Sequence, residues 1–246
     1  DLWRTAGGWR RSLAPRAADP DTRRNYELIQ ADSVVSGLII ATMTFVPVFF
    51  VRSGASAFEV SLITTLPAVG GLLLAMPFGR LLERTTRLTR WWARSRLLTN
   101  AAYGALALVV ALVAPVLVIP VSLVVIALST LPQTLTQVVF PLVMDGIAGP
   151  RGRFDLLGRR WAVMGLATAV LTGLAGVMLD TLPMPVNYQL LFVAGGLSGV
   201  ASWWLCGRIR IAARDARGGS TTGAPVPSAA ARSEEHTSEL QSRLHL

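Results

Sequence analysis

The apolar stretch from residue 116 to 143 carries a set of polar side chains at helical spacing, namely Ser129, Gln133, Thr136 and Gln137. Their spacing of three and four residues places them on one face of a helix. An amide that faces hydrocarbon is costly, so this face should meet protein or water. Gln133 and Gln137 are therefore candidates for contacting a polar solute, and hydrogen bonding between helices is an equally good interpretation.

A second polar set lies in or beside the apolar stretch from residue 28 to 51 and contains Gln30, Asp32 and Thr42. Asp32 is the only acidic residue placed within reach of a membrane core, which makes it a candidate for a carboxylate that couples transport to an ion. Because it lies roughly one helical turn from the end of the stretch, a solvated or arginine-paired end residue is the alternative.

The chain has few histidines and cysteines, which limits catalysis by histidine and metal binding by thiols. His236 and His245 both lie in the polar C-terminal segment, and Cys206 is the single cysteine. These residues cannot build a disulfide framework or a thiolate metal site. The apolar stretches also contain no acidic pair and no phosphate-binding loop, so the sequence argues against an enzyme and predicts no cofactor.

The apolar residues occur in long blocks. They make up 52% of the 246 residues, and the mean hydropathy is +0.51, which exceeds the usual range of soluble proteins. A helix needs about 20 such residues to cross a bilayer core. Six blocks meet this need and predict an all-α, polytopic membrane protein with spans over residues 28–51, 58–82, 92–114, 116–143, 161–179 and 188–207.

The net charge of +9 follows membrane topology and does not indicate a nucleic-acid partner. The basic residues, all Arg, are concentrated after the second and fourth blocks, at Arg84, Arg87, Arg90, Arg94 and Arg96 and at Arg151, Arg153, Arg159 and Arg160. The alternate loops hold only Arg52. By the positive-inside rule we expect both termini on the cytoplasmic side of an inner membrane. The absence of Lys beside abundant Ala, Gly, Leu and Val favours a GC-rich bacterial genome.

Four segments follow from these patterns. Residues 1–24 read as a cytoplasmic tail, residues 25–210 as the six-helix bundle, and residues 211–231 as a linker rich in Gly, Ser, Thr, Pro and Ala. From Arg232 to Ser242 the chain resembles a translated sequencing adapter, so residues 232–246 are expected to be foreign. The expectation that follows is a natural protein cut off in its central loop.

A short motif closes the second block. Gly79, Glu83, Arg84 and Arg87 stand in the order Gly-x-x-x-acid-Arg-x-x-Arg. With six spans and a long polar stretch after the sixth, this motif resembles the N-terminal half of a major facilitator superfamily transporter. Thr86 and Leu88 depart from the family pattern, and the resemblance covers about residues 25–210.

The resemblance implies a fold of two inverted three-helix repeats, and the spacing of Gly79 and Glu83 indeed recurs at Gly176 and Asp180. It implies that the first and fourth spans line a central cavity for a small solute, and that a second six-helix half, absent from this chain, completes the carrier. It also implies a latch at the cytoplasmic side, formed by Glu83, Arg84 and Arg87 with Asp145. Arginines that only set topology and bind lipid phosphate are the alternative.

From the residues themselves, Gly79 is expected to permit close helix contact where a side chain would separate two helices. Trp203 and Trp204 suit the membrane interface. Beside a carrier that works by alternating access, the pattern also fits a stand-alone six-helix assembly or lipid-handling factor in the bilayer. A membrane-bound enzyme fits least well.

Overall fold

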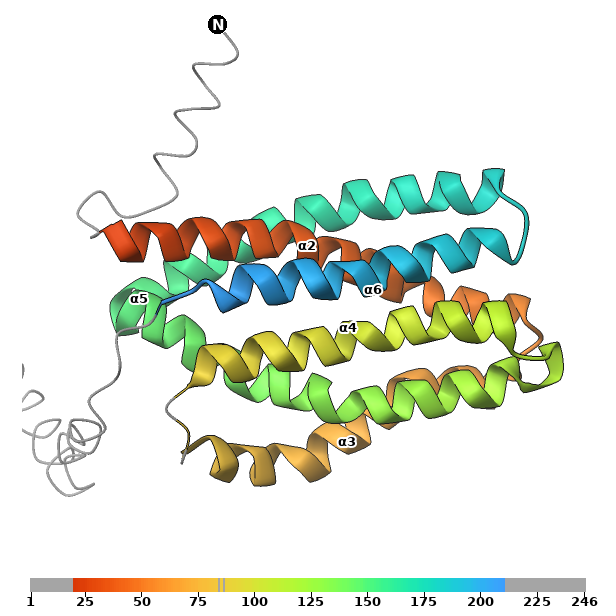
Figure 1. The fold of residues 1–246 in the computed structure, drawn as a ribbon, viewed down its shortest axis with the longest axis horizontal. Helices are drawn as coiled ribbons and strands as arrows, with labels where there is room; N and C mark the ends of the chain where they lie inside the picture. The colour runs from red at the N-terminus through yellow and green to blue at the C-terminus, as the bar shows by residue number, and fades with distance from the viewer. Residues whose placement is uncertain (1–19, 84, 86, 211–246) are drawn as a thin grey trace, which may run out of the picture. The chain divides into compact units, whose positions relative to one another are not determined.

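The computed structural model describes residues 20–83, 85 and 87–210, all of which belong to one compact unit. Every regular element in this part of the chain is a helix (Figure 1): α2 (Pro20–Arg52), α3 (Ala57–Glu83), α4 (Leu88–Leu112), α5 (Pro115–Thr181) and α6 (Val186–Gly207). Gly149 interrupts α5 with backbone angles of φ 66° and ψ 177°. We call Pro115–Gly149 the first arm of α5 and Gly152–Thr181 its second arm.

These helices supply 6 segments that are long and apolar enough to cross a membrane. The prediction of an all-α, multi-pass membrane protein with six spans is thereby confirmed, whereas the inverted repeat stays a prediction. The helices extend beyond the apolar blocks, and the largest difference is at the second arm, which begins at Gly152 and not at Trp161. Hydrogen bonding along a helix continues through polar residues, so apolarity marks only the part suited to hydrocarbon.

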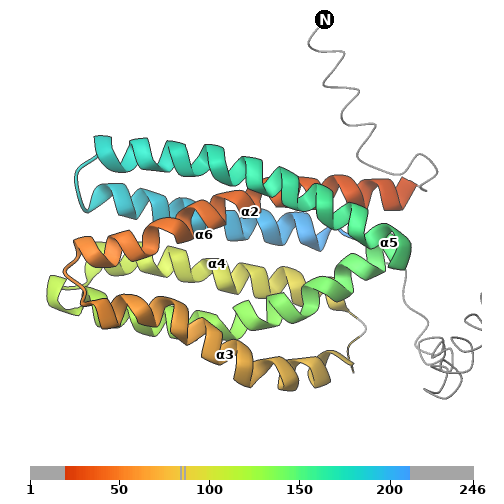
Figure 2. The same ribbon diagram turned by 180° about the vertical axis from the view of Figure 1, so that it is seen from behind.

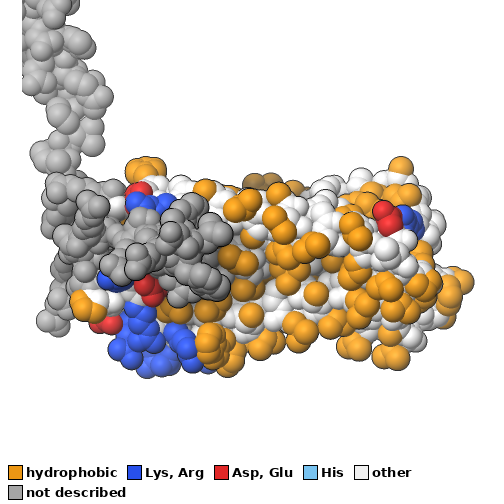
Figure 3. Space-filling model, turned by 90° about the horizontal axis from the view of Figure 1, so that it is seen from above, with side chains coloured by type: hydrophobic (Ala, Val, Ile, Leu, Met, Phe, Trp, Pro, Cys, Tyr) orange, Lys and Arg blue, Asp and Glu red, His pale blue; other side chains and the backbone are white. Residues whose placement is uncertain are grey.

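Consecutive segments run antiparallel, so the bundle has two ends (Figures 1 and 2). One end holds the start of α2, the end of α3, the start of α4, the Gly149 break and the end of α6. In Figure 3, basic side chains gather at this end while apolar side chains dominate the rest of the visible face. We call it the arginine-rich end.

Small residues set the contact between α4 and α6. A Cβ atom added to Gly196 would lie 2.9 Å from the Cα of Gly104, and one added to Gly199 would lie 2.6 Å from the Cβ of Asn100. Only glycine permits helices to approach this closely, a device common in membrane helices. α6 also packs on α2, so these helices lie side by side in the order α4, α6, α2 (Figure 1).

Two apolar clusters lie on either side of this contact. The cluster at the arginine-rich end includes Tyr26, Trp92 and Leu156, and the cluster toward the opposite end includes Phe49 and Phe192. Phe49 and Phe192 meet edge to face with ring centroids 5.3 Å apart, an arrangement that aromatic rings favour. Both clusters join residues from several helices, so they hold the bundle together along its length.

α3 lies at the edge of the bundle. It packs mainly on the first arm of α5, where Gly70 faces Thr130. None of its apolar window is buried, compared with 44% for α2. One side of the bundle, formed by α3, is therefore left uncovered.

Candidate functional site

The most buried charged residue in the described part of the chain is Asp32 on α2, whose side chain is fully inaccessible. One carboxylate oxygen, Oδ1, lies 3.2 Å from Nη2 of Arg96 on α4. The other, Oδ2, lies 3.0 Å from Nη1 of Arg160 on the second arm of α5. One carboxylate thus holds two guanidinium groups that come from two other helices.

Serine hydroxyls complete this arrangement. Ser202 on α6 donates a hydrogen bond of 2.6 Å to Oδ1 of Asp32. Ser36 accepts one hydrogen bond of 2.9 Å from Arg96 and another of 3.2 Å from Arg160. We call Asp32, Arg96, Arg160, Ser36 and Ser202 the buried charge cluster. It joins α2, α4, α6 and the second arm of α5.

Aromatic faces cover the two cations. The guanidinium carbon of Arg96 lies 5.7 Å from the ring centroid of Trp92. That of Arg160 lies 5.2 Å from the ring centroid of Phe140, on the first arm of α5. Cation–π contacts strengthen when they are removed from water. Through Phe140 the cluster also reaches the first arm, so α3 is the only described helix without a residue in or against it.

The cluster carries an excess of positive charge. Arginine stays protonated in proteins, so two guanidinium groups against one carboxylate leave a surplus cation where Arg96 and Arg160 are 9% and 4% exposed. Such a surplus is tolerated only because several hydrogen bonds satisfy each group. The arrangement can hold four helices in one register. No group of three potential metal ligands occurs among the described residues.

Two arginines of the cluster lie in the interior although their sequence positions predicted basic loops. Arg96 and Arg160 were assigned to basic loops, but both lie on helices and are buried. Arg160 lies one residue before its predicted apolar block and Arg96 lies near the start of its own block. In both cases the helix begins several residues earlier than the block and turns this arginine to the interior. A signal was present in α6, where Ser202 and Cys206 lie one turn apart on one face within an apolar run. Cys206 Sγ is 3.5 Å from Oδ1 of Asp32.

The polar face predicted on the fourth span lies on the first arm of α5. Gln137 is exposed and Gln133 is half-buried, and neither makes a hydrogen bond to another described residue. Ser129 is half-buried and donates to the Ile126 carbonyl of its own helix. Gln133 lies near the middle of this arm. We call Gln133 and Gln137 the open amide pair.

Other predicted cavity residues serve helix contacts. The Thr136 hydroxyl lies 2.9 Å from the Ser95 hydroxyl on α4. Thr42 is fully buried, donates to the Leu38 carbonyl and packs against Gly195 of α6. Gln30 is 6% exposed, and neither its amide nitrogen nor its amide oxygen has a partner in the described part of the chain. The predicted set therefore divides into three buried residues of α2, the two half-buried hydroxyl residues Ser129 and Thr136, and the open amide pair.

The loop motif lies at the arginine-rich end. Glu83 ends α3 and is exposed, Arg87 is exposed before α4, and Asp145 is half-buried on the first arm of α5. Arg84 lies outside the described residues. A Cβ atom added to Gly79 would meet no described atom within 4 Å. The described helices therefore do not approach one another closely at Gly79, and close helix contact there stays a prediction.

No family model, no curated protein and no solved structure matches this chain. A functional proposal therefore has to be built on the geometry of the helices and on the loop motif.

Proposed function

We propose that this chain is one half of a solute carrier that resembles the major facilitator superfamily, and that it moves a small polar solute by rocking against a second six-helix bundle. The observation that carries this proposal is the open amide pair. Two amides one turn apart, Gln133 and Gln137, lie near the middle of an apolar helix without a hydrogen-bond partner in the described part of the chain.

An unpartnered amide in hydrocarbon is unfavourable, because its donors and acceptors lose their bonds to water. A water-filled cavity or a second bundle removes this cost. The helix that carries these amides and the neighbouring α3 are poorly covered: 17% of the apolar window of the first arm and none of that of α3 are buried, compared with 44% for α2. A partner bundle that packs here would cover α3 and enclose the open amide pair.

In this proposal the buried charge cluster positions the helices and does not contact solute. Its two ion pairs join α2, α4 and the second arm of α5, and the hydrogen bond from Ser202 adds α6. Breaking them would leave charges unpaired in a nonpolar interior. The bundle would therefore move as one body, which alternating access by rocking requires.

The proposal also gives the orientation of the bundle in the membrane. The arginines gather at the end that holds the start of α2 and the end of α6. By the positive-inside rule this end is cytoplasmic, which is expected of a protein of a bacterial inner membrane. Glu83, Arg84, Arg87 and Asp145 would then form the cytoplasmic latch that the family resemblance implies.

Thiol labelling in membranes tests the open amide pair. In membrane vesicles that contain the full-length protein, Gln133→Cys and Gln137→Cys should react with a charged maleimide roughly tenfold or more faster than Leu128→Cys, because thiolates form readily only in contact with water. Leu128 is the matched control on the same arm, 63% exposed on a different face. The protein without an introduced cysteine, in which Cys206 of this chain is buried, sets the background.

Equal, slow labelling at all three positions would mean that the amide face meets lipid, and the carrier proposal would fail. A positive result leads to a solute screen. Purified full-length protein should be stabilised against heat by one class among sugars, amino acids and carboxylates, and Gln133→Leu should abolish that stabilisation. A stand-alone assembly or lipid-handling factor predicts no such solute.

A further inference from the structure

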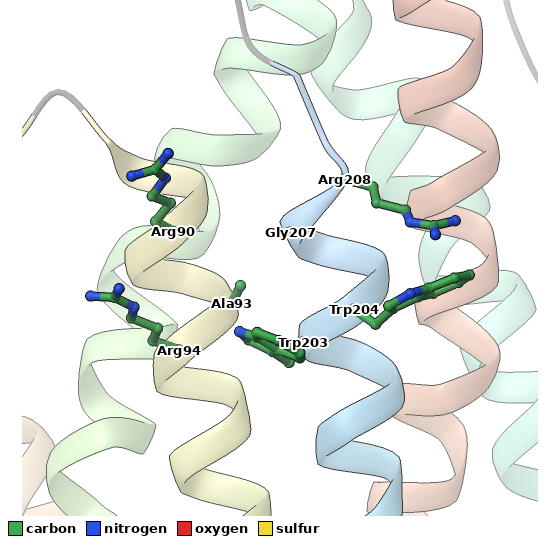
Figure 4. A pocket seen from close by; sticks show the side chains of 7 residues that line it. All are labelled: Arg90, Ala93, Arg94, Trp203, Trp204, Gly207 and Arg208. Carbon is green, nitrogen blue, oxygen red and sulfur yellow. The ribbon is translucent and has the colours of Figure 1, made fainter.

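A pocket opens at the surface of the arginine-rich end, between α4 and α6 (Figure 4). Its volume is about 370 Å³. Arg90 and Arg94 extend from α4, Trp203 lies between the two helices, and Arg208 lies beside Trp204 on α6. The small residues Ala93 and Gly207 also line it, which leaves room between the larger side chains.

The pocket lining is strongly cationic. It includes three arginines and no acidic residue. Arg90, Arg94 and Arg208 form no ion pair with another described residue. A smaller neighbouring pocket of about 120 Å³ shares Arg90 and Arg94 and adds Arg87. The preferred ligand is therefore an anion with several acceptor oxygens, such as a phosphate group.

Along α4 and α6, the exposed side chains change from charged to apolar between the arginine-rich end and the middle of the bundle. On α4, Arg90 and Arg94 lie on one face with Leu98, which is 61% exposed. On α6, Arg208 lies on one face with Trp204 and Val200, which are 50% and 51% exposed. Cations thus give way to exposed aliphatic side chains along both walls. A phospholipid has the same order, from phosphate to acyl chain.

Two tryptophans lie between the arginines and the exposed aliphatic side chains. The tryptophan ring is apolar and carries one hydrogen-bond donor, so it favours the lipid headgroup region. Trp203 and Trp204 are 45% and 50% exposed. The guanidinium carbon of Arg208 lies 3.4 Å from the Trp204 ring centroid. Both side chains extend from α6 on the side away from α4 (Figure 4).

We propose that this pocket binds the headgroup of an anionic phospholipid, with its phosphate on the α4 side at Arg90 and Arg94 and its acyl chains along the outer faces of α4 and α6. Arg208, which extends from the opposite side of α6 (Figure 4), adds positive charge at the same end of the bundle. Basic pockets between membrane helices are suited to such headgroups. The site is independent of whether the chain transports a solute. Free phosphate shares the ionic chemistry but gains nothing from Leu98 or Val200.

Native mass spectrometry of the full-length protein in detergent tests this site. Dioleoyl phosphatidylglycerol, dioleoyl phosphatidylcholine and inorganic phosphate are the probes. The wild-type protein should retain phosphatidylglycerol in preference to phosphatidylcholine. The triple variant R90Q/R94Q/R208Q should bind phosphatidylglycerol more weakly by roughly tenfold or more, since each arginine near an anionic lipid contributes on the order of 1 kcal/mol.

The matched control is R23Q/R24Q/R80Q, which removes three exposed arginines from the same end of the bundle. It should keep phosphatidylglycerol binding within about twofold of wild type. A second variant, Gly207→Leu, fills the pocket without changing the charge; a Cβ atom at Gly207 meets nothing within 4 Å. It should weaken lipid binding as the triple variant does.

Three results would overturn the assignment. The first is a wild-type protein that does not distinguish the two lipids. The second is equal loss of binding in both triple variants, because the effect would then be one of general surface charge. The third is displacement of phosphatidylglycerol by an equal concentration of inorganic phosphate, which would make the site one for free phosphate.

Discussion

Arg94 and Arg96 lie two residues apart on α4 and have opposite surroundings. Arg94 is exposed and lines the pocket between α4 and α6. Arg96 is 9% exposed, contacts Asp32 at 3.2 Å and belongs to the buried charge cluster. Two positions along a helix are rotated by about 200°, so neighbouring arginines face opposite sides. The helical face decides which cation stabilises the fold and which is available to a ligand.

The two regions also differ in what the loss of one charge should do. In the buried charge cluster, each group is satisfied by neighbouring protein groups and has little contact with water. At the surface pocket, water solvates each arginine, so a lost charge affects ligands more than folding. The following variants test this difference.

The largest effect is expected for Asp32→Asn. This change leaves two buried guanidinium groups without a counter-charge, so we expect a loss of about 3–5 kcal/mol in the free energy of unfolding. Reversible unfolding in mixed micelles with increasing sodium dodecyl sulfate measures it. Asp21→Asn, at an exposed acid in the first turn of the same helix, is the control. Equal stability of the two variants would show that the cluster does not hold the helices.

Arg160→Met should cost less, about 1–3 kcal/mol, because Asp32 and Arg96 remain as a neutral pair. The same unfolding measurement applies. In the double variant Asp32→Asn/Arg160→Met, the loss should be smaller than the sum of the two single losses. Arg159→Met, which removes an exposed pair with Asp155, should cost less than about 1 kcal/mol. Strict additivity would contradict a direct interaction in the cluster.

Gly196→Ala tests the contact that brings the two walls together. The new Cβ atom would lie 2.9 Å from Gly104, so α4 and α6 must separate. We expect a loss of about 1–3 kcal/mol in the free energy of unfolding, and weaker phosphatidylglycerol binding in the same preparation. Gly207→Ala, with nothing within 4 Å, should leave stability unchanged. If Gly196→Ala also left the free energy of unfolding unchanged, the close approach of α4 and α6 would not contribute to stability.

The smallest effect is expected for Arg94→Gln. Its free energy of unfolding should equal that of the wild-type protein within error, because Arg94 is exposed and forms no ion pair with a described residue. Arg96→Gln, two residues away, should be measurably destabilised. If both variants lost the same stability, the contrast between the two faces of α4 would be wrong.

The open amide pair and the buried charge cluster were not equally predictable. Gln133 and Gln137 were identified from their spacing alone. Two amides in a long apolar block can be recognised in the sequence however the helix packs. Asp32 was identified as well, with an arginine partner among the alternatives. Arg96 and Arg160 were not, because each lies at the edge of an apolar block among arginines that face water. The role of Thr136 also changed, since its hydroxyl meets Ser95 of α4.

The sequence by itself determined the number and class of the spans, because the length of apolar chain needed to cross a bilayer does not depend on neighbouring helices. It also determined which end of the bundle is rich in arginine. Only the tertiary structure decided which of those arginines are buried. That choice depends on the angle and closeness at which α2, α4 and α6 pack, and the glycine contacts that set it join residues far apart in the chain.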